Sequence, residues 1–419
     1  MGLTVERLSG PDALRSIERE WERLDVLTVP RSPFSSPLWN SVWWTHYRKR
    51  GLLARDEFFV HVVRSSNGEL IAIAPLFRRS WPGIGPLRLR FVQFFGADAA
   101  ITDIRGLVCA PENEEIAWRA LRQHFQATSS EWDIFRFDGL RGRPEDIHWL
   151  NQPGVAALTQ GPNYFVELPG SWDELHKRVN GNFRRNMRKQ REVFDADGHT
   201  YALDLIDSLG ELPAALDKLF ALHSLRADSD GMEVKHPDRF ADPQNRGFIR
   251  DYVLKMAGRG RVRLFELKID GTTVASQLTI VLGDQLWFLS SGFDTAWRKY
   301  GIMTMLTVEV MKWAIESRFK IVNLSCGHDR GKTRWNPAEV ILSNFLWRAP
   351  GLRGLMLARV YWSLEMSRQP AGPEAGIPAR GWRWLPAFDR PALGVIGNNL
   401  LQNYCGLISE ASDLLSMIA

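Results

Sequence analysis

The 419-residue sequence has only three cysteines, Cys109, Cys326 and Cys405, and they lie far apart. This number and spacing predict neither a disulfide framework nor a zinc site. No apolar run reaches the roughly eighteen residues that a membrane-spanning helix needs, and residues 1–25 lack the apolar core of a secretory signal peptide. We therefore expect a cytoplasmic protein without a metal centre.

The chain also lacks a strong charge imbalance, since 53 Lys and Arg against 48 Asp and Glu leave a net charge of +5. That surplus is too small to predict nucleic-acid binding by itself, although it suits anionic partners. A composition that is 45% hydrophobic and 24% charged is typical of globular proteins, and the length allows two cores. Tryptophan is abundant at 17 residues. We expect most of them in cores, with a sugar-stacking groove as the alternative.

The most informative stretch covers residues 290–335. An apolar run ends at Ser291-Gly292-Phe293-Asp294, which predicts a bend, and apolar residues three and four apart then predict a helix over residues 302–318. Residues 320–324 predict a strand that leads into a polar loop. The first N–H groups of a helix lack intrahelical partners and carry the positive end of its dipole. A glycine just before the helix therefore predicts an anion site suited to phosphate.

The residues before this helix, Arg298-Lys299-Tyr300-Gly301-Ile302-Met303, resemble in degenerate form the acyl-CoA pyrophosphate loop of the GNAT acyltransferases, Gln/Arg-x-x-Gly-x-Gly/Ala. Arg298 and Gly301 match, and Met303 stands where a small residue is usual. The wider stretch, with Trp297, Gly327, Lys332 and Trp335, resembles the CelD/BcsL-type (BioF2-like) branch, which is tied to polysaccharide synthesis, cellulose included. FemAB-like peptidyltransferases are more distant relatives. The chain has Gly331 and Asn323 where that branch often has Tyr and Asp.

The order of predicted elements and the resemblance together indicate an α+β fold of tandem GNAT-like domains, with mixed, mostly antiparallel sheets flanked by helices. We expect an N-terminal domain over residues 1–165, a C-terminal acyltransferase domain over 166–350, and a helical extension with a Pro/Gly-rich linker over 351–419. Residues 340–347 are expected to close the C-terminal sheet. The resemblance implies that the strand ending at Ser290 parts from the strand at Ile321, and that backbone groups in the gap bind pantetheine.

The resemblance implies acetyl-CoA or another acyl-CoA as co-substrate, bound by Ser290, Ser291, Arg298, Lys299, Tyr300, Gly301, Ile302 and Met303. Transfer to an amine needs the amine in its neutral form, and a lysine-like ammonium with a pKa of about 10.4 would need a proton acceptor more than an amino sugar would. The candidate acid and base groups are His223, Asp294, His328 and Asp329. A buried structural histidine, a bend-capping carboxylate and a solvated loop are the respective alternatives. Gln277, Lys332 and Trp335 are candidates for substrate binding, and His46, Asp98 and Asp103 lie near predicted loops.

Residues 177–191 form the most basic stretch of the chain. At helical spacing Arg184 meets Arg188, and such like charges destabilise a helix unless an anion lies between them. These two arginines could bind an anionic glycan, a lipid-linked acceptor, a membrane surface or tRNA, or could be a solvated face. Because Phe183 is the only aromatic residue before Phe194, nucleic acid is the less favoured partner.

We expect an acyl-CoA-dependent N-acyltransferase that acts on an amine acceptor, an amino sugar or related precursor of a surface polysaccharide. The acceptor comes from the resemblance alone. A FemAB-like transferase that uses aminoacyl-tRNA and a non-catalytic accessory protein of a polysaccharide synthase are the alternatives. Contact with polysaccharide-synthesis machinery is a further expectation, and residues 391–419 could dock on the chain itself or on a partner or membrane surface.

Overall fold

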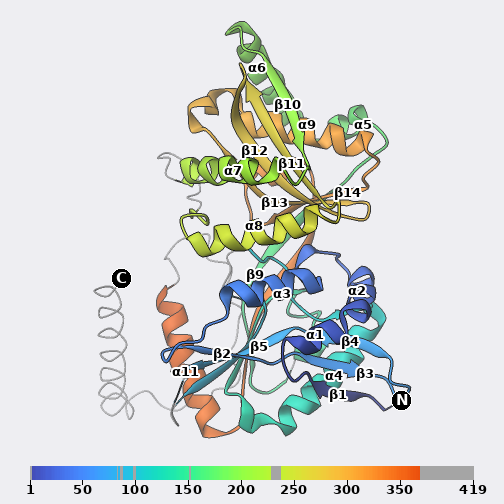
Figure 1. Cartoon of the computed structure of the whole chain (residues 1–419), viewed down its shortest axis with the longest axis vertical. Coiled ribbons are helices and arrows are strands. Elements are labelled where there is room, and N and C mark those ends of the chain that lie inside the picture. The colour runs from blue at the N-terminus through green and yellow to red at the C-terminus, as the bar shows by residue number, and fades with distance from the viewer. Residues whose placement is uncertain are drawn as a thin grey trace. The chain divides into compact units, whose positions relative to one another are not determined.

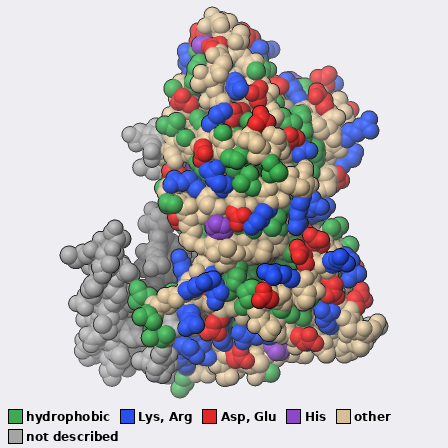
Figure 2. All heavy atoms as spheres, viewed as in Figure 1, with side chains coloured by type: hydrophobic (Ala, Val, Ile, Leu, Met, Phe, Trp, Pro, Cys, Tyr) green, Lys and Arg blue, Asp and Glu red, His purple; other side chains and the backbone are tan. Residues whose placement is uncertain are grey.

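The computed structural model describes residues 2–82, 84, 88–97, 101–150, 152–227 and 237–368. In this part of the chain the strands form a four-stranded sheet, in the order β1-β3-β4-β7, and an eleven-stranded sheet, in the order β10-β11-β12-β13-β14-β9-β15-β8-β6-β5-β2 (Figure 1). No helix in these ranges has the length and hydropathy needed to cross a membrane. On the face shown in Figure 2, Lys and Arg side chains are interspersed with Asp and Glu rather than gathered in one patch.

The first half of the chain contributes strands to both sheets. Its elements are β1 (Thr4–Arg7), α1 (Asp12–Ser16), α2 (Glu18–Leu27), η1 (Pro33–Ser35), α3 (Pro37–Tyr47), β2 (Arg55–Phe58), β3 (His61–Arg64), β4 (Leu70–Ala74), β5 (Leu76–Trp81), β6 (Leu89–Phe94), β7 (Val108–Cys109), α4 (Pro111–Ala127), η2 (Ser129–Glu131), β8 (Ile134–Arg141), η3 (His148–Leu150) and β9 (Val155–Glu167). Residues 58–63 and 69–78, on either side of Ser66-Asn67-Gly68, predict a single hairpin, and this prediction is partly wrong. β3 pairs with β4 in the small sheet, whereas β2 pairs with β5 in the large one. The chain changes sheets at Pro75, which has no N–H to donate to a ladder.

The second half follows the predicted order of elements. They are α5 (Trp172–Arg178), α6 (Gly181–Ala196), β10 (Tyr201–Ile206), α7 (Leu212–Ala227), α8 (Pro243–Ala257), β11 (Val262–Ile269), β12 (Thr272–Leu282), β13 (Gln285–Phe293), η4 (Thr295–Tyr300), α9 (Ile302–Glu316), β14 (Ile321–Cys326), α10 (Arg330–Thr333), β15 (Ala338–Arg348) and α11 (Gly351–Arg368). β10 to β13 form an antiparallel meander, and α7 and α9 both pack on β12 (Figure 1). The pairs Asp270-Gly271 and Gly283-Asp284 predict two hairpin turns, and both turns lie where predicted, between β11 and β12 and between β12 and β13.

β13 and β14 part as the resemblance implies. They pair in parallel only from Gln285 with Ile321 to Trp287 with Asn323. Beyond Trp287, β13 stays paired with β12 on its other side as far as Phe293, whereas β14 pairs with β9. One side of β13 therefore has no strand partner over residues 288–293.

β15 does not close the C-terminal sheet where the sequence predicts it. β9 lies between β14 and β15, and β15 pairs on its other side with β8 of the first half. The prediction misses this because strand exchange is long-range, whereas the residue pattern reports only that residues 340–347 form a strand. The boundary at residue 165 falls inside β9. The linker and tail predicted over residues 369–419 lie outside the described residues, and α11 contains the helix predicted before them.

The two halves also share a core. Most of the 17 tryptophans are core residues, as expected, since nine of them are buried: Trp21, Trp39, Trp43, Trp44, Trp118, Trp132, Trp287, Trp335 and Trp347. Trp39 of α3 meets Phe248 and Tyr252 of α8 edge-on, with ring centroids 4.8 and 4.7 Å apart. Such pairs contribute about 0.5–1.5 kcal/mol each beyond their buried area. A single apolar cluster thus joins a helix of the first half to a helix of the second.

Candidate functional site

The segment predicted to be a bend before the site helix is instead the end of a strand. β13 runs through Ser291, Gly292 and Phe293, with Phe293 paired to Ala275. A Cβ on Gly292 would lie 2.4 Å from the backbone nitrogen of His223, so glycine is required here because α7 packs closely on β13. The reversal comes later, at η4. Asp294 caps η4 by accepting a hydrogen bond from the Ala296 N–H at 2.9 Å.

Gly301 sets the start of α9. Its φ and ψ of 65° and 40° lie in the left-handed region that favours glycine. Its carbonyl accepts hydrogen bonds from the N–H groups of Thr304 and Met305 at 2.8 and 3.0 Å. The N–H groups of Ile302 and Met303 precede these bonds and have no intrahelical partner. The positive end of α9 is therefore built as the anion-site hypothesis requires.

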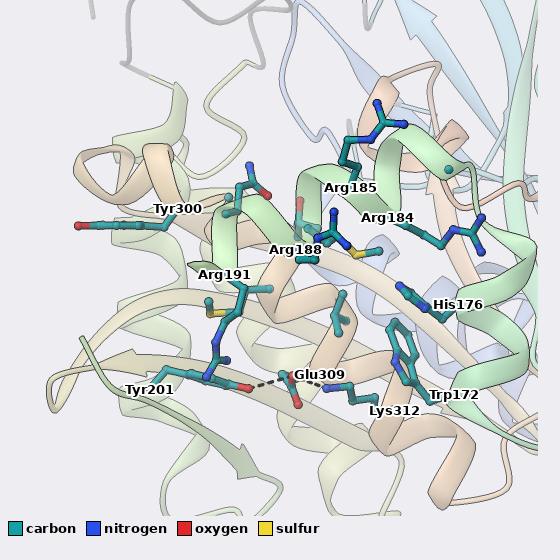
Figure 3. Close-up of a pocket in the computed structure, with 17 residues that line it drawn as sticks. Trp172, His176, Arg184, Arg185, Arg188, Arg191, Tyr201, Tyr300, Glu309 and Lys312 are labelled. Atoms are coloured by element: carbon teal, nitrogen blue, oxygen red, sulfur yellow. Dashed lines mark hydrogen bonds and ion pairs between the residues drawn. The ribbon is translucent and has the colours of Figure 1, made fainter. Parts of the chain in front are cut away.

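A cavity of about 650 Å³ lies between α6 and α9, beside Gly301 (Figure 3). α9 lines it with residues one helical turn apart, which are Gly301, Thr304, Met305, Val308, Glu309 and Lys312. α6 contributes Arg184, Arg185, Met187, Arg188, Gln190 and Arg191, and neighbouring elements add Trp172, His176, Tyr201 and Tyr300. The structure thus brings the predicted loop residues Tyr300 and Gly301 together with the basic residues Arg184 and Arg188.

The one carboxylate among these lining residues, Glu309, already has hydrogen-bond and ion-pair partners. Glu309 Oε1 accepts hydrogen bonds from the Tyr201 hydroxyl at 3.1 Å and from Lys312 Nζ at 2.9 Å (Figure 3). The Arg191 guanidinium lies 4.8 Å from the centroid of the Tyr201 ring and pairs with Asp195 at 2.9 Å. Glu309 therefore does not neutralise the arginines of α6 that line the cavity.

Three arginines of α6 supply that excess positive charge. Neither Arg184 nor Arg185 makes an ion pair with any residue in the described ranges, and Arg184 is only half-buried. Arg188 lies 3.7 Å from Glu192, with both side chains largely exposed, and such exposed pairs contribute little. The cavity is consequently cationic next to the positive end of a helix.

Gln190 covers that helix end. A Cβ built on Gly301 would lie 2.2 Å from Gln190 Oε1, so the carboxamide rests directly against the glycine. A side chain at residue 301 would have to displace this carboxamide, and the positive φ of Gly301 would strain its backbone.

A second polar cluster lies at the end of β14, where the first half of the chain contributes. Ser325 has a φ of 69°, and its hydroxyl donates to Asp103 Oδ2 at 2.5 Å. The Cys326 N–H donates to the same oxygen at 3.1 Å. A cavity of about 350 Å³ beside them is lined in part by Asp103, Arg105, Cys326 and Gly327. Lys332 donates to the Cys326 carbonyl, and burial lowers the pKa of Lys332 despite Asp329 and Asp103 nearby.

The four candidate acid and base groups occupy different settings. His223 is 8% exposed, its Nδ1 lies 3.4 Å from Asp238 Oδ1, and burial lowers its pKa. Asp294 is the cap of η4. His328 is exposed, and its Nδ1 lies 2.8 Å from the Tyr164 hydroxyl. Asp329 caps α10 by accepting from the Lys332 N–H at 3.1 Å. Only His328 and Asp329 share one loop.

Gln277 and Trp335, two of the candidates for substrate binding, lie in the interior. Gln277 Nε2 donates to the carbonyls of Leu278 and Ser290, both at 3.0 Å, where β13 carries a bulge against β12. Trp335 is 2% exposed and packs edge-on against Phe183 at 5.2 Å. Both side chains support the strands and helix around the site.

The remaining candidates for donor binding lie on the unpaired part of β13 and on η4 and the start of α9. Arg226 Nη1 donates to the Ser291 hydroxyl at 3.4 Å, and Ser290 is half-buried on the same strand. Lys299 and Tyr300 both bind Asp197, at 3.0 and 2.7 Å. Arg298 is exposed, Ile302 is buried and Met303 is half-buried. His46 lies away from this region and pairs with Asp251 at 3.2 Å, while Asp98 lies outside the described residues.

The sequence interpretation did not identify Gln190, Arg191, Tyr201, Glu309 or Lys312 as site residues. The available signal was the one-turn spacing of Glu309 and Lys312 after Gly301, which places them on one helix face. A metal-based site has no support in the described ranges, where no group of three or more His, Cys, Asp or Glu side chains could hold an ion.

Burial and the adjacent Asp103 raise the pKa of the Cys326 thiol far above its usual value. The reactive form of a cysteine is the thiolate, which this setting disfavours. Cys326 is therefore no candidate for a covalent nucleophile.

Residues 181–333 match the family described as acetyltransferase (GNAT) domain. The solved structure of FemX has a TM-score of 0.57 and 11% identity, covering 84% of this chain and 99% of that one. L-PGS from Bacillus licheniformis has a TM-score of 0.46 and 13% identity, covering 86% and 98%. A tandem GNAT protein from the clavulanic acid biosynthesis pathway has a TM-score of 0.46 and 13% identity, covering 84% and 100%. No curated protein matches the chain.

The match over residues 181–333 contains α6, β13, Gly301, α9 and the loop after β14, so it covers the gap between the strands and all of the cavity lining except Trp172 and His176. The similarity to FemX extends along both halves and concerns the fold. The protein is an acyltransferase with a tandem GNAT-like fold, and its GNAT-type acetyltransferase domain carries the candidate site.

Proposed function

We propose that the protein is an acyl-CoA-dependent N-acyltransferase whose acceptor is an amino sugar or a related precursor of a surface polysaccharide. The observation that carries the proposal is that an unpaired strand edge, on β13, leads into a cationic cavity at the start of α9. The unpaired side of β13 leads directly to η4 and then to the positive end of α9, where the cationic cavity begins. An extended donor fits this arrangement if its amide-bearing end lies along β13 and its phosphorylated end lies in the cavity at α9.

The strand gap suits the pantetheine part of such a donor. Because β13 has no strand partner on one side beyond Trp287, alternate backbone groups of residues 288–293 remain available for hydrogen bonds to amides. Ser290 and Ser291 add hydroxyl groups there. The bulge that Gln277 braces changes the direction of the backbone groups next to it, which suits binding of a thioester carbonyl.

The start of α9 suits the phosphates. The N–H groups of Ile302 and Met303 and the side chains of Arg184 and Arg188 border the same cavity, so we assign these two arginines to the donor rather than to the acceptor. A hydrogen bond to a charged acceptor contributes about 1.5–3 kcal/mol, against about 0.3–1 for an exposed helix dipole. Direct contacts therefore provide most of the affinity. Arg298, Lys299 and Tyr300 hold the turn that presents Gly301.

The transfer itself needs few groups. The amine nitrogen attacks the thioester carbonyl, the carbon–nitrogen bond forms, the carbon–sulfur bond breaks, and the amine proton must leave while the thiolate gains one. We assign proton acceptance to His328, on the exposed loop after β14. If its Nδ1–H donates to the Tyr164 oxygen, Nε2 is left as the acceptor. Burial raises the pKa of Tyr164 and keeps the phenol protonated.

The experiment combines acetyl-CoA with glucosamine, galactosamine and lysine as acceptors and measures thiol release together with product mass. We expect amide formation with an amino sugar. His328→Gln should lower kcat about 100-fold or more, with the KM for acetyl-CoA unchanged. His148→Gln is the matched control because His148 is an exposed histidine on η3, away from the loop. Absence of both acetyl-CoA binding and thiol release in the unmodified protein would contradict the proposal.

A FemAB-like transferase that uses aminoacyl-tRNA is the second candidate. The unpaired arginines of α6 favour it, because a polyanion would neutralise them, and the FemX fold similarity is compatible with it. Binding of an aminoacylated RNA minihelix, without binding of acetyl-CoA, would select this candidate. The cytoplasmic location, the contact with polysaccharide-synthesis machinery and the domain limits at residues 165 and 350 remain predictions from the sequence.

A further inference from the structure

We infer that the groove between α6 and α9 binds the phosphoadenosine end of the donor, with Arg184 selecting its 3′-phosphate and Trp172 contacting its base. This inference rests on the proposed function and specifies which part of the donor each wall of the groove recognises. It is carried by the shape of the cavity, by the arginine spacing on α6 and by the aromatic end opposite Gly301.

The groove is elongated along α9. Gly301 lines one end and Lys312 the other, and eleven residues at about 1.5 Å each separate them by about 16 Å. The intervening lining residues Thr304, Met305 and Val308 share one helix face. A ligand that enters at Gly301 therefore extends along α9 rather than ending at its N-terminus.

The opposite wall presents positive charge at regular intervals. Arg184, Arg188 and Arg191 follow one another by one helical turn, which places neighbouring Cβ atoms about 5–6 Å apart. Arg191 is held by Asp195 and Tyr201, whereas Arg184 has no ion-pair partner in the described ranges. Like charges at this spacing repel each other unless anions lie between them. Phosphate groups on two sides of a ribose would meet this requirement.

The end of the groove away from Gly301 is aromatic. Figure 3 shows Arg184 at the same end as Trp172 and His176. The rings of Trp172 and His176 stack at 5.7 Å with an interplanar angle of 27°, and Lys312 Nζ lies 5.5 Å from the Trp172 ring centroid. Trp172 is only half-buried, and an accessible aromatic ring in a cationic groove can contact a nucleotide base. Met187, Met305 and Val308 add apolar lining between this end and Gly301.

These positions give the ligand a direction. The pyrophosphate lies at the N–H groups of Ile302 and Met303, in place of the Gln190 carboxamide, and Arg188 binds it from α6. The base lies against Trp172, and the 3′-phosphate beside it reaches Arg184. Of the phosphate contacts proposed, only the one to Arg184 is absent when the donor lacks its 3′-phosphate, which makes this residue the point at which the inference can be tested.

The test compares acetyl-CoA with acetyl-dephospho-CoA in the full chain. A charge-assisted hydrogen bond of about 1.5–3 kcal/mol corresponds to a preference for acetyl-CoA of about 10- to 100-fold in kcat/KM. Arg184→Ala should remove this preference, and Arg184→Lys should keep part of it. Lys189→Ala is the matched control. It removes one positive charge from the same helix, but Lys189 does not line the groove.

The possible outcomes test the groove assignment and the proposed acyltransferase function separately. Equal use of the two donors by the unmodified protein, or equal effects of Arg184→Ala and Lys189→Ala, overturns the groove assignment and leaves the acyltransferase proposal standing. Failure to bind or use either donor contradicts the proposed function. Calorimetry with 3′,5′-ADP needs no turnover, and binding that Arg184→Ala weakens and Lys189→Ala does not supports the site directly. A CCA-ended RNA minihelix that displaces 3′,5′-ADP, with no binding of acetyl-CoA, would identify RNA as the source of the nucleotide and overturn the CoA assignment.

Discussion

Replacing Gly301 with alanine tests whether the start of α9 binds the phosphates of the donor. The residue has a φ of 65°, and its missing Cβ leaves room for Gln190, whose Oε1 would lie 2.2 Å from a methyl group there. The substitution therefore has two separable consequences. It strains the backbone of the free protein, and it places a methyl group beside the N–H groups that we assign to phosphate.

The expected magnitudes follow from these contacts. A non-glycine residue in the left-handed region costs roughly 1–2 kcal/mol, and displacement of Gln190 adds little because its carboxamide is the end of a flexible side chain. The loss of one or two charge-assisted hydrogen bonds costs a further 1.5–3 kcal/mol each in donor binding, or about 10- to 100-fold for one bond. We therefore expect a modest loss of stability and a large rise in the Kd for acetyl-CoA.

Urea denaturation and calorimetric titration with acetyl-CoA measure the two effects. Gly260→Ala is the matched control, since Gly260 has a φ of 70° and nothing within 4 Å of its would-be Cβ. It should show a similar loss of stability and no change in donor binding. Gln190→Ala alone should tighten donor binding, because the phosphate no longer competes with the carboxamide. If Gly301→Ala binds acetyl-CoA as tightly as Gly260→Ala does, the N–H groups before α9 do not hold the donor.

Three further predictions concern the thiol, the core and the division of the chain. Cys326→Ala should keep kcat within about threefold, since the raised pKa of this thiol disfavours the thiolate, and a loss of about a thousandfold would restore covalent catalysis. Burial raises the pKa of Asp25 to about 6, above its unfolded value of about 3.9, so its contribution to stability falls as pH rises from about 4 through 6. Asp25→Asn should accordingly stabilise the protein at pH 7 by up to about 3 kcal/mol, a gain that vanishes by pH 4 in paired denaturation curves and that a pH-independent difference would contradict. A fragment of residues 166–350 lacks most of β9, the shared partner of β14 and β15, so it should not unfold cooperatively; a melting curve like that of the full chain would refute this.

Local signals in the sequence correctly predicted much of the second half. The apolar residues spaced three and four apart gave α9, and Ser171 is the helix cap that its Ser-x-x-Glu pattern predicts, accepting from the Glu174 N–H at 3.3 Å. Asp-Gly and Gly-Asp pairs marked two hairpins. Each of these features is determined by residues within one turn or one hairpin of each other, which is why a single sequence suffices to predict them.

The errors arose where distant parts of the chain meet. Gly292 suggested a bend because glycine is common in turns, but the residue is glycine because α7 lies against β13. Arg184 and Arg188 were identified from their charge, yet their relation to Gly301 depends on how α6 packs against α9. No local pattern reports that packing. The exchange of β9 and β15 between the halves was unpredictable for the same reason.

The first half shapes the loop after β14, which carries the candidate residues His328 and Asp329, through Asp103. Ser325 holds a left-handed φ that costs roughly 1–2 kcal/mol, and Asp103 Oδ2 accepts hydrogen bonds from both its hydroxyl and the next N–H. Two bonds to a carboxylate, each contributing about 1.5–3 kcal/mol, outweigh that strain. The turn at Ser325 directs the chain toward His328 and Asp329. Since the carboxylate that stabilises this turn comes from residue 103, the second half depends on the first for the geometry of this candidate loop as well as for the strand between β14 and β15.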